Sequence, residues 1–236
     1  MRHPSWTVTF IAILTFGLTL SAAYWQLQRA EHKEALELRF NRMQTKDILD
    51  LNTDINSSKD IEYRRVVVTG TLDASKRMIL DNRIRRGQAG YELLMPFSLT
   101  GSENIVLINL GWIPRGRVFG EIPDVKTPDG VIKVTGTIVK PGFGALELSE
   151  NTVDGEIWQN LDLSRYRLRT SLNVLNYVIQ VEGAENFNTQ FERTWPKRSF
   201  GIETHLSYAG QWLFFSFMTL FFYIYYGFIK QQDKTK

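Results

Sequence analysis

A histidine followed by two aromatic residues is the part of this sequence best suited to chemistry. Tyr208 and Trp212 follow His205 at spacings typical of one helix face, and an uncharged stretch runs from residue 206 to residue 229. Neutral imidazole is a usual axial ligand of haem iron. An ionisable residue at a membrane boundary is a candidate functional residue by default. His205 is therefore a candidate ligand of haem iron, and the alternative, an interfacial histidine that hydrogen-bonds lipid headgroups or Tyr208, stays open on the residues alone.

A second group of suitable side chains stands at the end of another uncharged stretch, residues 4–28. Trp25 and Gln26 lie near its end, and Arg29 follows it. Aromatic faces, an imidazole and a cation at a membrane surface suit an amphipathic porphyrin, whose propionates would meet Arg29, Lys197 or Arg198. The alternative is an ordinary interfacial belt of aromatic and basic residues. The predicted cofactor site therefore comprises six residues: His205, Tyr208, Trp212, Trp25, Gln26 and Arg29.

Two membrane helices would bring these groups together. Each uncharged stretch is long enough to cross a bilayer, which takes about 20 apolar residues. We predict transmembrane helices at residues 6–28 and 205–229, one running outward and the other returning, so that both groups lie at the same outer surface. A cleavable signal peptide is the alternative for the first stretch, because Arg2 precedes an apolar segment that ends in small residues at positions 21–23.

The charge distribution predicts the orientation of these helices. The chain has 28 Lys and Arg against 25 Asp and Glu, and its two tails hold four of the basic residues and one of the acidic ones. The remaining 24 of each sign leave the middle neutral. Short basic flanks stay cytoplasmic, so tails 1–5 and 230–236 are predicted inside and domain 29–204 outside. That compartment is the periplasm in a bacterium and the intermembrane space in a mitochondrion. A neutral domain lacks the positive field that nucleic-acid binding requires.

The sequence of domain 29–204 predicts one helix followed by a β-rich region. Leu36, Phe40 and Met43 share one face of a predicted helix at 29–47 that continues from the first apolar stretch, and residues 52–60 read as a loop. Short runs rich in β-branched and aromatic residues predict strands at 65–72, 77–81, 91–99, 104–112, 131–139, 156–161 and 175–181. Residues 164–173 predict a short helix. Pro96 indicates an edge or bulge.

The fold class predicted from this pattern is an α+β membrane protein, with two transmembrane helices flanking a mostly antiparallel, barrel-like β domain outside the cytoplasm. The segment 67–71 (VVTGT) resembles 133–137 (KVTGT), which suggests equivalent positions in a barrel-like sheet.

Several kinds of chemistry are excluded or unsupported. The chain has no cysteine, so disulfides, thiolate catalysis and covalent haem attachment through cysteine are excluded. No phosphate loop, serine-hydrolase elbow, zinc helix or dinucleotide fingerprint is present, and Gly142-Phe143-Gly144 reads as a turn. His3 and His32 are predicted in solvent. Arginine clusters at 83–86, 115–117 and 165–169 are predicted in loops or on solvated faces.

The order of several short motifs resembles the SURF1 (Shy1) family of cytochrome c oxidase assembly factors. Residues 25–29 (WQLQR) are similar to a family motif at the end of the first span, and residues 63–70 to a strand motif that begins with Tyr-Arg. Residues 90–96, the Gly-Trp-Ile-Pro at 111–114 and the pattern from His205 to Trp212 follow in the family order.

This resemblance implies a role that the residue patterns alone do not. It implies a non-enzymatic assembly factor of the bacterial inner membrane that binds haem a through His205 and assists haem insertion into subunit I of cytochrome c oxidase. Haem a synthase and membrane lipid are the further partners it implies. Two alternatives remain: a haem-independent chaperone of an oxidase subunit, and a membrane-tethered periplasmic enzyme.

Overall fold

The chain divides into two units, each of which is described by itself. The computed structural model describes residues 4–54, 60–116, 128–141, 153–183, 191–195 and 199–229. The helical unit comprises Met1–Asn41 and Lys197–Lys236, and the β unit comprises Arg42–Pro196. Residues 1–3 and 230–236 of the two tails lie outside the described residues, as do Arg117, Lys197, Arg198 and the turn predicted at 142–144, so the predictions made for them stay predictions.

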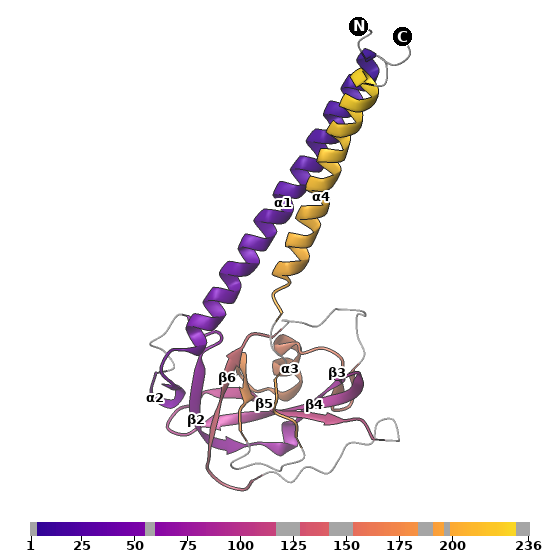
Figure 1. Ribbon diagram of the computed structural model, residues 1–236. Helices are drawn as coiled ribbons and strands as arrows, with labels where there is room; N and C mark the ends of the chain where they lie inside the picture. Colours follow the sequence, from indigo (N-terminus) through magenta and orange to yellow (C-terminus); the bar gives the residue numbers. More distant parts are fainter. Residues whose placement is uncertain are drawn as a thin grey trace. The chain divides into compact units, whose positions relative to one another are not determined.

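The helical unit consists of two antiparallel helices. Helix α1 (Trp6–Gln44) is continuous, so the predicted helix after residue 29 is confirmed as an extension of the apolar stretch. Helix α4 (Ile202–Ile224) ends in a π-helical turn, η2 (Tyr225–Ile229). The two helices lie side by side in Figure 1, with the start of α1 beside the end of α4.

Small and polar residues form the seam between the two helices. Within the helical unit, the buried positions of α1 are Thr19, Ala23, Gln26 and Ala30, which recur every three or four residues and so share one face. On α4, Ala209 and Ser216 are buried. Small side chains let helix backbones approach closely, which is how membrane helices commonly pack.

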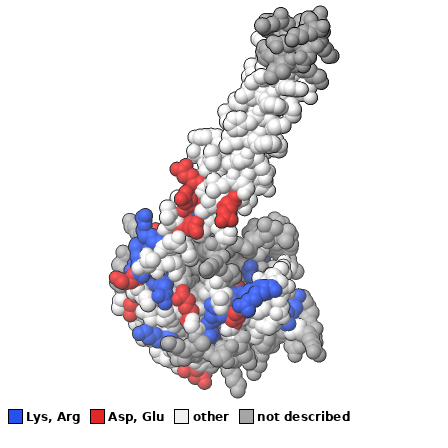
Figure 2. All heavy atoms as spheres, viewed as in Figure 1, with Lys and Arg blue, Asp and Glu red and all other residues white. Residues whose placement is uncertain are grey.

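Helix α1 is long and apolar enough to cross a membrane. Within the described residues it is the one helix that meets this criterion. Helix α4 carries no charged residue from 206 to its end, but Ser, Thr, Tyr and Gln side chains interrupt its phenylalanines. The second predicted span therefore stays a prediction. In Figure 2, the visible face of the apolar part of the helical unit shows no charged atoms.

The β unit is a closed sheet with short added strands. Its strands are β1 (Leu49–Asp50), β2 (Arg65–Leu72), β3 (Met78–Arg85), β4 (Gln88–Leu99), β5 (Ile105–Pro114), β6 (Ile132–Val139), β7 (Val153–Asp154), β8 (Ile157–Trp158) and β9 (Val174–Val181). Strands β2, β6, β9, β5 and β4 pair in that order, and pairing of β2 with β4 closes the ring. The predicted barrel-like sheet is confirmed. Pairs β1–β2, β3–β8 and β5–β9 are parallel, and the other pairs are antiparallel.

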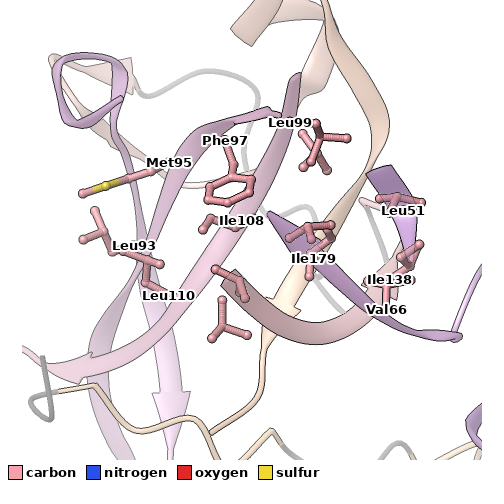
Figure 3. Packing of buried hydrophobic residues seen from close by; sticks show 14 of the residues in the cluster. Leu51, Val66, Leu93, Met95, Phe97, Leu99, Ile108, Leu110, Ile138 and Ile179 are labelled. Carbon is pink, nitrogen blue, oxygen red and sulfur yellow. The ribbon is translucent and has the colours of Figure 1, made fainter. Parts of the chain in front are cut away.

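The barrel is filled by side chains that alternate along each strand. Odd-numbered residues of β4, from Tyr91 to Leu99, point inward, together with Val106, Ile108 and Leu110 of β5. Figure 3 shows this interior cluster. Leu94 and Leu107 instead join an outer cluster with Tyr166 of helix α3 (Leu163–Thr170). Strands β4 and β5 are thus buried on both faces.

The repeated Val-Thr-Gly-Thr segment marks two equivalent positions, as predicted. Strands β2 and β6 pair antiparallel with Val68 opposite Val134. A Cβ on Gly70 would lie 2.0 Å from the main-chain oxygen of Ser98, and one on Gly136 would lie 2.3 Å from that of Gln180. Each glycine therefore permits the close approach of the next strand in the ring.

Three local predictions were wrong. Residues 52–60 were predicted as a loop, but helix α2 (Leu51–Asp54) covers the start of that segment. Pro96 lies neither at a bulge nor on an edge strand: β4 exchanges partner there, from β3 at Leu94 to β2 at Phe97, and its bulge lies between Glu92 and Leu94. A proline is tolerated at such a point because its missing N–H has no ladder partner to lose.

The third error concerns the first arginine cluster. Arg83 and Arg85 belong to strand β3 rather than to a loop, and Arg85 is buried. The strand extends further than predicted because Ile84 and the arginines pair with residues 88–90 of β4.

Candidate functional site

His205 and Gln26, predicted from separate parts of the sequence, are in direct contact within the helical unit. The imidazole Nδ1 lies 2.7 Å from the side-chain oxygen Oε1 of Gln26. His205 occupies the first turn of α4, where its main-chain N–H reaches back to the carbonyl of Gly201. Gly201 has a positive φ of 72°, which glycine adopts without strain, and this turn of the backbone starts the helix.

The two side chains of this contact differ in their exposure to solvent. Gln26 is 9% exposed and lies in the seam between Ala23 and Ala30, whereas His205 is half-buried. A side-chain amide oxygen only accepts hydrogen bonds, so the facing Nδ1 donates its hydrogen. The second ring nitrogen, Nε2, has no hydrogen-bond partner among the described residues.

The aromatic and cationic residues of the predicted site lie on the outer faces of the two helices. Trp25 is exposed, and the Arg29 guanidinium lies 5.8 Å from the centre of its ring. Tyr208 and Trp212 are exposed one turn apart on α4, and the Trp212 ring meets Phe215 edge-on. In the described part of the chain, no hydrogen bond or ring contact joins Tyr208 or Trp212 to α1.

Two further polar contacts join α1 and α4, and sequence reasoning missed both. Thr19 Oγ1 lies 2.7 Å from Ser216 Oγ, and Thr9 Oγ1 lies 3.0 Å from the Tyr223 hydroxyl. Single hydroxyl residues in an otherwise apolar stretch were the available signal, because such groups seek partners between membrane helices. Together with Gln26 and His205, these pairs fix the antiparallel register of the two helices.

Arg85 is the main residue of the β unit that sequence reasoning missed. Its guanidinium donates to two main-chain oxygens of segment 191–195 and to the Glu92 carboxylate. It also lies 4.9 Å from the ring centre of Trp195 and 5.9 Å from that of Trp112. A buried charge without partners would be costly, so the arginine and the groups that it contacts stabilise one another. Arg85 therefore has a structural role: it holds segment 191–195 against strands β3 and β4.

The Gly-Trp motif packs against the same segment. Gly111 has a φ of 127°, and a Cβ there would lie 2.9 Å from Phe191. Trp112 exchanges two main-chain hydrogen bonds with Glu192. Its indole covers Gly90, where a Cβ would lie 2.4 Å from ring carbons. The Gly90 and Gly111-Trp112 motifs therefore form one packing unit that holds segment 191–195 on the barrel.

Two arginines of the β unit have shifted pKa values. The hydrogen bond to the Asp81 carboxylate raises the pKa of Arg115. Burial lowers the pKa of Arg193, whose Nε donates to the Leu110 carbonyl. Within the described ranges, no three His, Asp or Glu side chains converge as ligands of a bare metal ion would.

The fold and the helical unit together define a class of protein: a barrel-like β domain on a helix that is long and apolar enough to cross a membrane. Comparison with known proteins is more specific. The family model "SURF1 family" matches residues 11–217. The chain belongs to the SURF1 family, whose members are known in general as oxidase assembly factors.

Individual relatives agree over nearly the whole chain. A SURF1-like protein of Rickettsia felis is 24% identical over 92% of this chain and 95% of its own length. The protein named Surfeit locus protein 1 is 24% identical in Takifugu rubripes, covering 88% of this chain and 90% of that protein. In Homo sapiens it is 25% identical, covering 88% of this chain and 72% of that protein. The resemblance drawn from the short motifs is confirmed.

Proposed function

We propose that the protein is a membrane assembly factor for haem-copper (cytochrome c) oxidase that assists insertion of haem a into subunit I by binding the haem transiently. Membership of the SURF1 family supports the assembly role. The contact between His205 and Gln26 carries the haem-binding part, because it leaves one nitrogen of a half-buried imidazole available at the end of an apolar helix pair.

The residues present fit a haem group. Haem a, when bound, supplies an iron that takes a neutral imidazole nitrogen as an axial ligand. His205 offers Nε2 for that purpose. Trp25, Tyr208 and Trp212 offer exposed aromatic surface, and Arg29 offers a cation for a propionate. Lys197 and Arg198, the other cations proposed for the propionates, lie outside the described residues.

The proposal includes a second membrane span. Helix α4 lies antiparallel to α1, and both polar pairs in the apolar part are satisfied between the helices. An unsatisfied hydroxyl in lipid is costly, so pairing of this kind suits two helices in one bilayer. We propose that both tails are cytoplasmic and that the β unit lies in the periplasm at a bacterial inner membrane, anchored in its lipid.

The proposed partners follow from this role. Subunit I of the oxidase would receive the haem, and haem a synthase would supply it. Members of the SURF1 family are known in general as oxidase assembly factors, and we propose no catalytic residue. A haem-independent chaperone of an oxidase subunit is the competing function.

The visible spectrum of the full-length protein tests the proposal. The protein is produced together with haem a synthesis and purified in detergent. We expect haem a absorbance in the wild type, its loss in His205→Ala, and its retention in His32→Ala, because His32 is exposed further along α1. An unchanged spectrum in His205→Ala would remove His205 as the ligand. Haem-free wild type that still binds subunit I would favour the chaperone.

A further inference from the structure

The partner of the His205 imidazole is an uncharged amide held in a fixed place. Gln26 lies in the buried seam of α1, with Ala23 and Ala30 about one turn away on either side. Its Oε1 is 2.7 Å from Nδ1 of His205. Because its backbone belongs to the long helix α1, the oxygen is presented to the ring from a rigid element.

We propose that Gln26 is a positioning residue that selects the His205 tautomer and limits the strength of the imidazole as an iron ligand. This inference rests on the proposed haem-binding function. An accepting oxygen holds the ring hydrogen on Nδ1, so the lone pair is kept on Nε2. The same hydrogen bond fixes the ring orientation, as outer partners of ligating histidines generally do.

The absence of charge on Gln26 is the second part of the inference. A carboxylate at this position would attract the Nδ1 hydrogen more strongly and make the imidazole a stronger donor. An amide oxygen also orients the imidazole ring, but it increases the donor strength of the imidazole less than a carboxylate does. A carrier must release its haem, so a neutral partner suits transient binding better than a carboxylate does.

Binding of the iron by His205 requires one new bond and no proton transfer. The Nε2 lone pair would form the coordinate bond to iron while the hydrogen stays on Nδ1, and release would break only that coordinate bond. No proton leaves the site, and no other reactant is required.

The tautomer can be measured without haem. Full-length protein labelled with ¹⁵N-histidine is reconstituted in lipid nanodiscs, and the ring nitrogens of His205 are assigned by comparison with His205→Ala. We expect Nε2 to be unprotonated in the wild type and in Gln28→Leu, a matched control whose glutamine is exposed on α1 and contacts Tyr24. In Gln26→Leu we expect a mixture of tautomers. An unprotonated Nδ1 in the wild type, or no change in Gln26→Leu, would overturn the inference.

The ligand strength is measured by titrating haem a into the same proteins. We expect Gln26→Leu to weaken binding about 10- to 100-fold, as loss of an outer partner typically does. Gln26→Glu should bind haem more tightly and release it more slowly, and Gln28→Leu should match the wild type. Equal affinities in all four proteins would overturn the inference. If the wild type binds no haem, the proposed function fails, whereas the tautomer measurement still decides the positioning role.

Discussion

At the scale of single residues, the structure explains motifs whose meaning the sequence did not reveal. Gly90 and Gly111-Trp112 are far apart in the sequence, yet the Trp112 indole lies on Gly90, and Gly111 makes room for Phe191. Arg85 completes this unit from a neighbouring strand. These residues hold the segment 191–195 to the barrel, so their role is structural and separate from that of His205.

Tyr177 gives a prediction about pH at the same scale. Its hydroxyl is buried with no hydrogen-bond partner in the described part of the chain, and burial raises its pKa from 10.0 to about 12. Below pH 10 the tyrosine is neutral in both the folded and the unfolded state. Between pH 10 and 12 only the unfolded state ionises, so the free energy of unfolding falls as the pH rises.

The variant Tyr177→Phe removes both the orphaned hydroxyl and the ionisation. We expect it to be as stable as the wild type or up to about 1 kcal/mol more stable near pH 8, and to lose less stability above pH 10. Tyr166→Phe is the contrast: its hydroxyl donates to the Lys76 carbonyl at 2.6 Å, so its loss should destabilise the protein by about 1 kcal/mol at pH 8. Denaturant unfolding of the full-length protein across this pH range measures the stability of both variants. Equal changes in the free energy of unfolding would contradict the claim that the Tyr177 hydroxyl has no partner and the Tyr166 hydroxyl has one.

At the scale of elements, one side chain completes the closure of the barrel. The Asn52 amide accepts from the Thr69 N–H at 2.8 Å and donates to the carbonyls of Thr69 and Thr100 at 2.7 and 2.9 Å. Strand β1 pairs with β2 as far as Val67, and the pairing of β2 with β4 begins at Gly70. The Asn52 amide hydrogen-bonds β2 in the gap between these two pairings. Helix α2 carries this amide.

Removing that amide should loosen the closed sheet. We expect Asn52→Ala to lower the free energy of unfolding by about 1–3 kcal/mol, because the partly buried N–H of Thr69 loses its partner and the carbonyls of Thr69 and Thr100 each lose a donor. Thr53→Ala is the matched control, since the Thr53 hydroxyl is exposed and bonds only locally to Asp50. The measurement is denaturant unfolding followed by circular dichroism. A loss in Thr53→Ala as large as that in Asn52→Ala would show that the effect belongs to the helix and not to the amide.

The sequence predicted elements better than it predicted contacts between them. Strand 65–72 was placed at its true bounds because it is rich in β-branched residues and Asp73 follows it. The two-residue strands β1 and β7 carry too little pattern to be found. Arg85 was placed in solvent because arginine is usually exposed, and nothing nearby in the sequence shows that Trp195 stacks on it. Helix order predicted only that the groups containing His205 and Gln26 lie at a similar depth; the direct contact between the two side chains was not predicted.

At the scale of the whole molecule, the account depends on two spans of opposite direction. The helical unit supplies the antiparallel pair, and the β unit follows α1 in the chain and precedes α4. Hydropathy supports α1 as a span. For α4 the support is the absence of charge and the hydrogen bonds to α1, which make the pair more suitable for lipid than α4 alone.

The lack of cysteine makes this topology simple to test. A single cysteine introduced at Ser164 of the β unit should react with a membrane-impermeant maleimide in cells with a permeable outer membrane. One introduced at Lys236 should react only after the inner membrane is disrupted. Labelling of both sites before disruption would mean that α4 does not return across the membrane, and labelling of neither would place the β unit inside.

The most direct test of the central claim, that His205 binds the iron, is pulsed electron paramagnetic resonance of the ferric haem a complex. The full-length protein is labelled with ¹⁵N-histidine. We predict hyperfine coupling to a directly bound histidine nitrogen in the wild type and in His32→Ala, and its loss in His205→Ala. Coupling of the same strength in His205→Ala, or a haem complex of the wild type with no histidine coupling, would contradict the account.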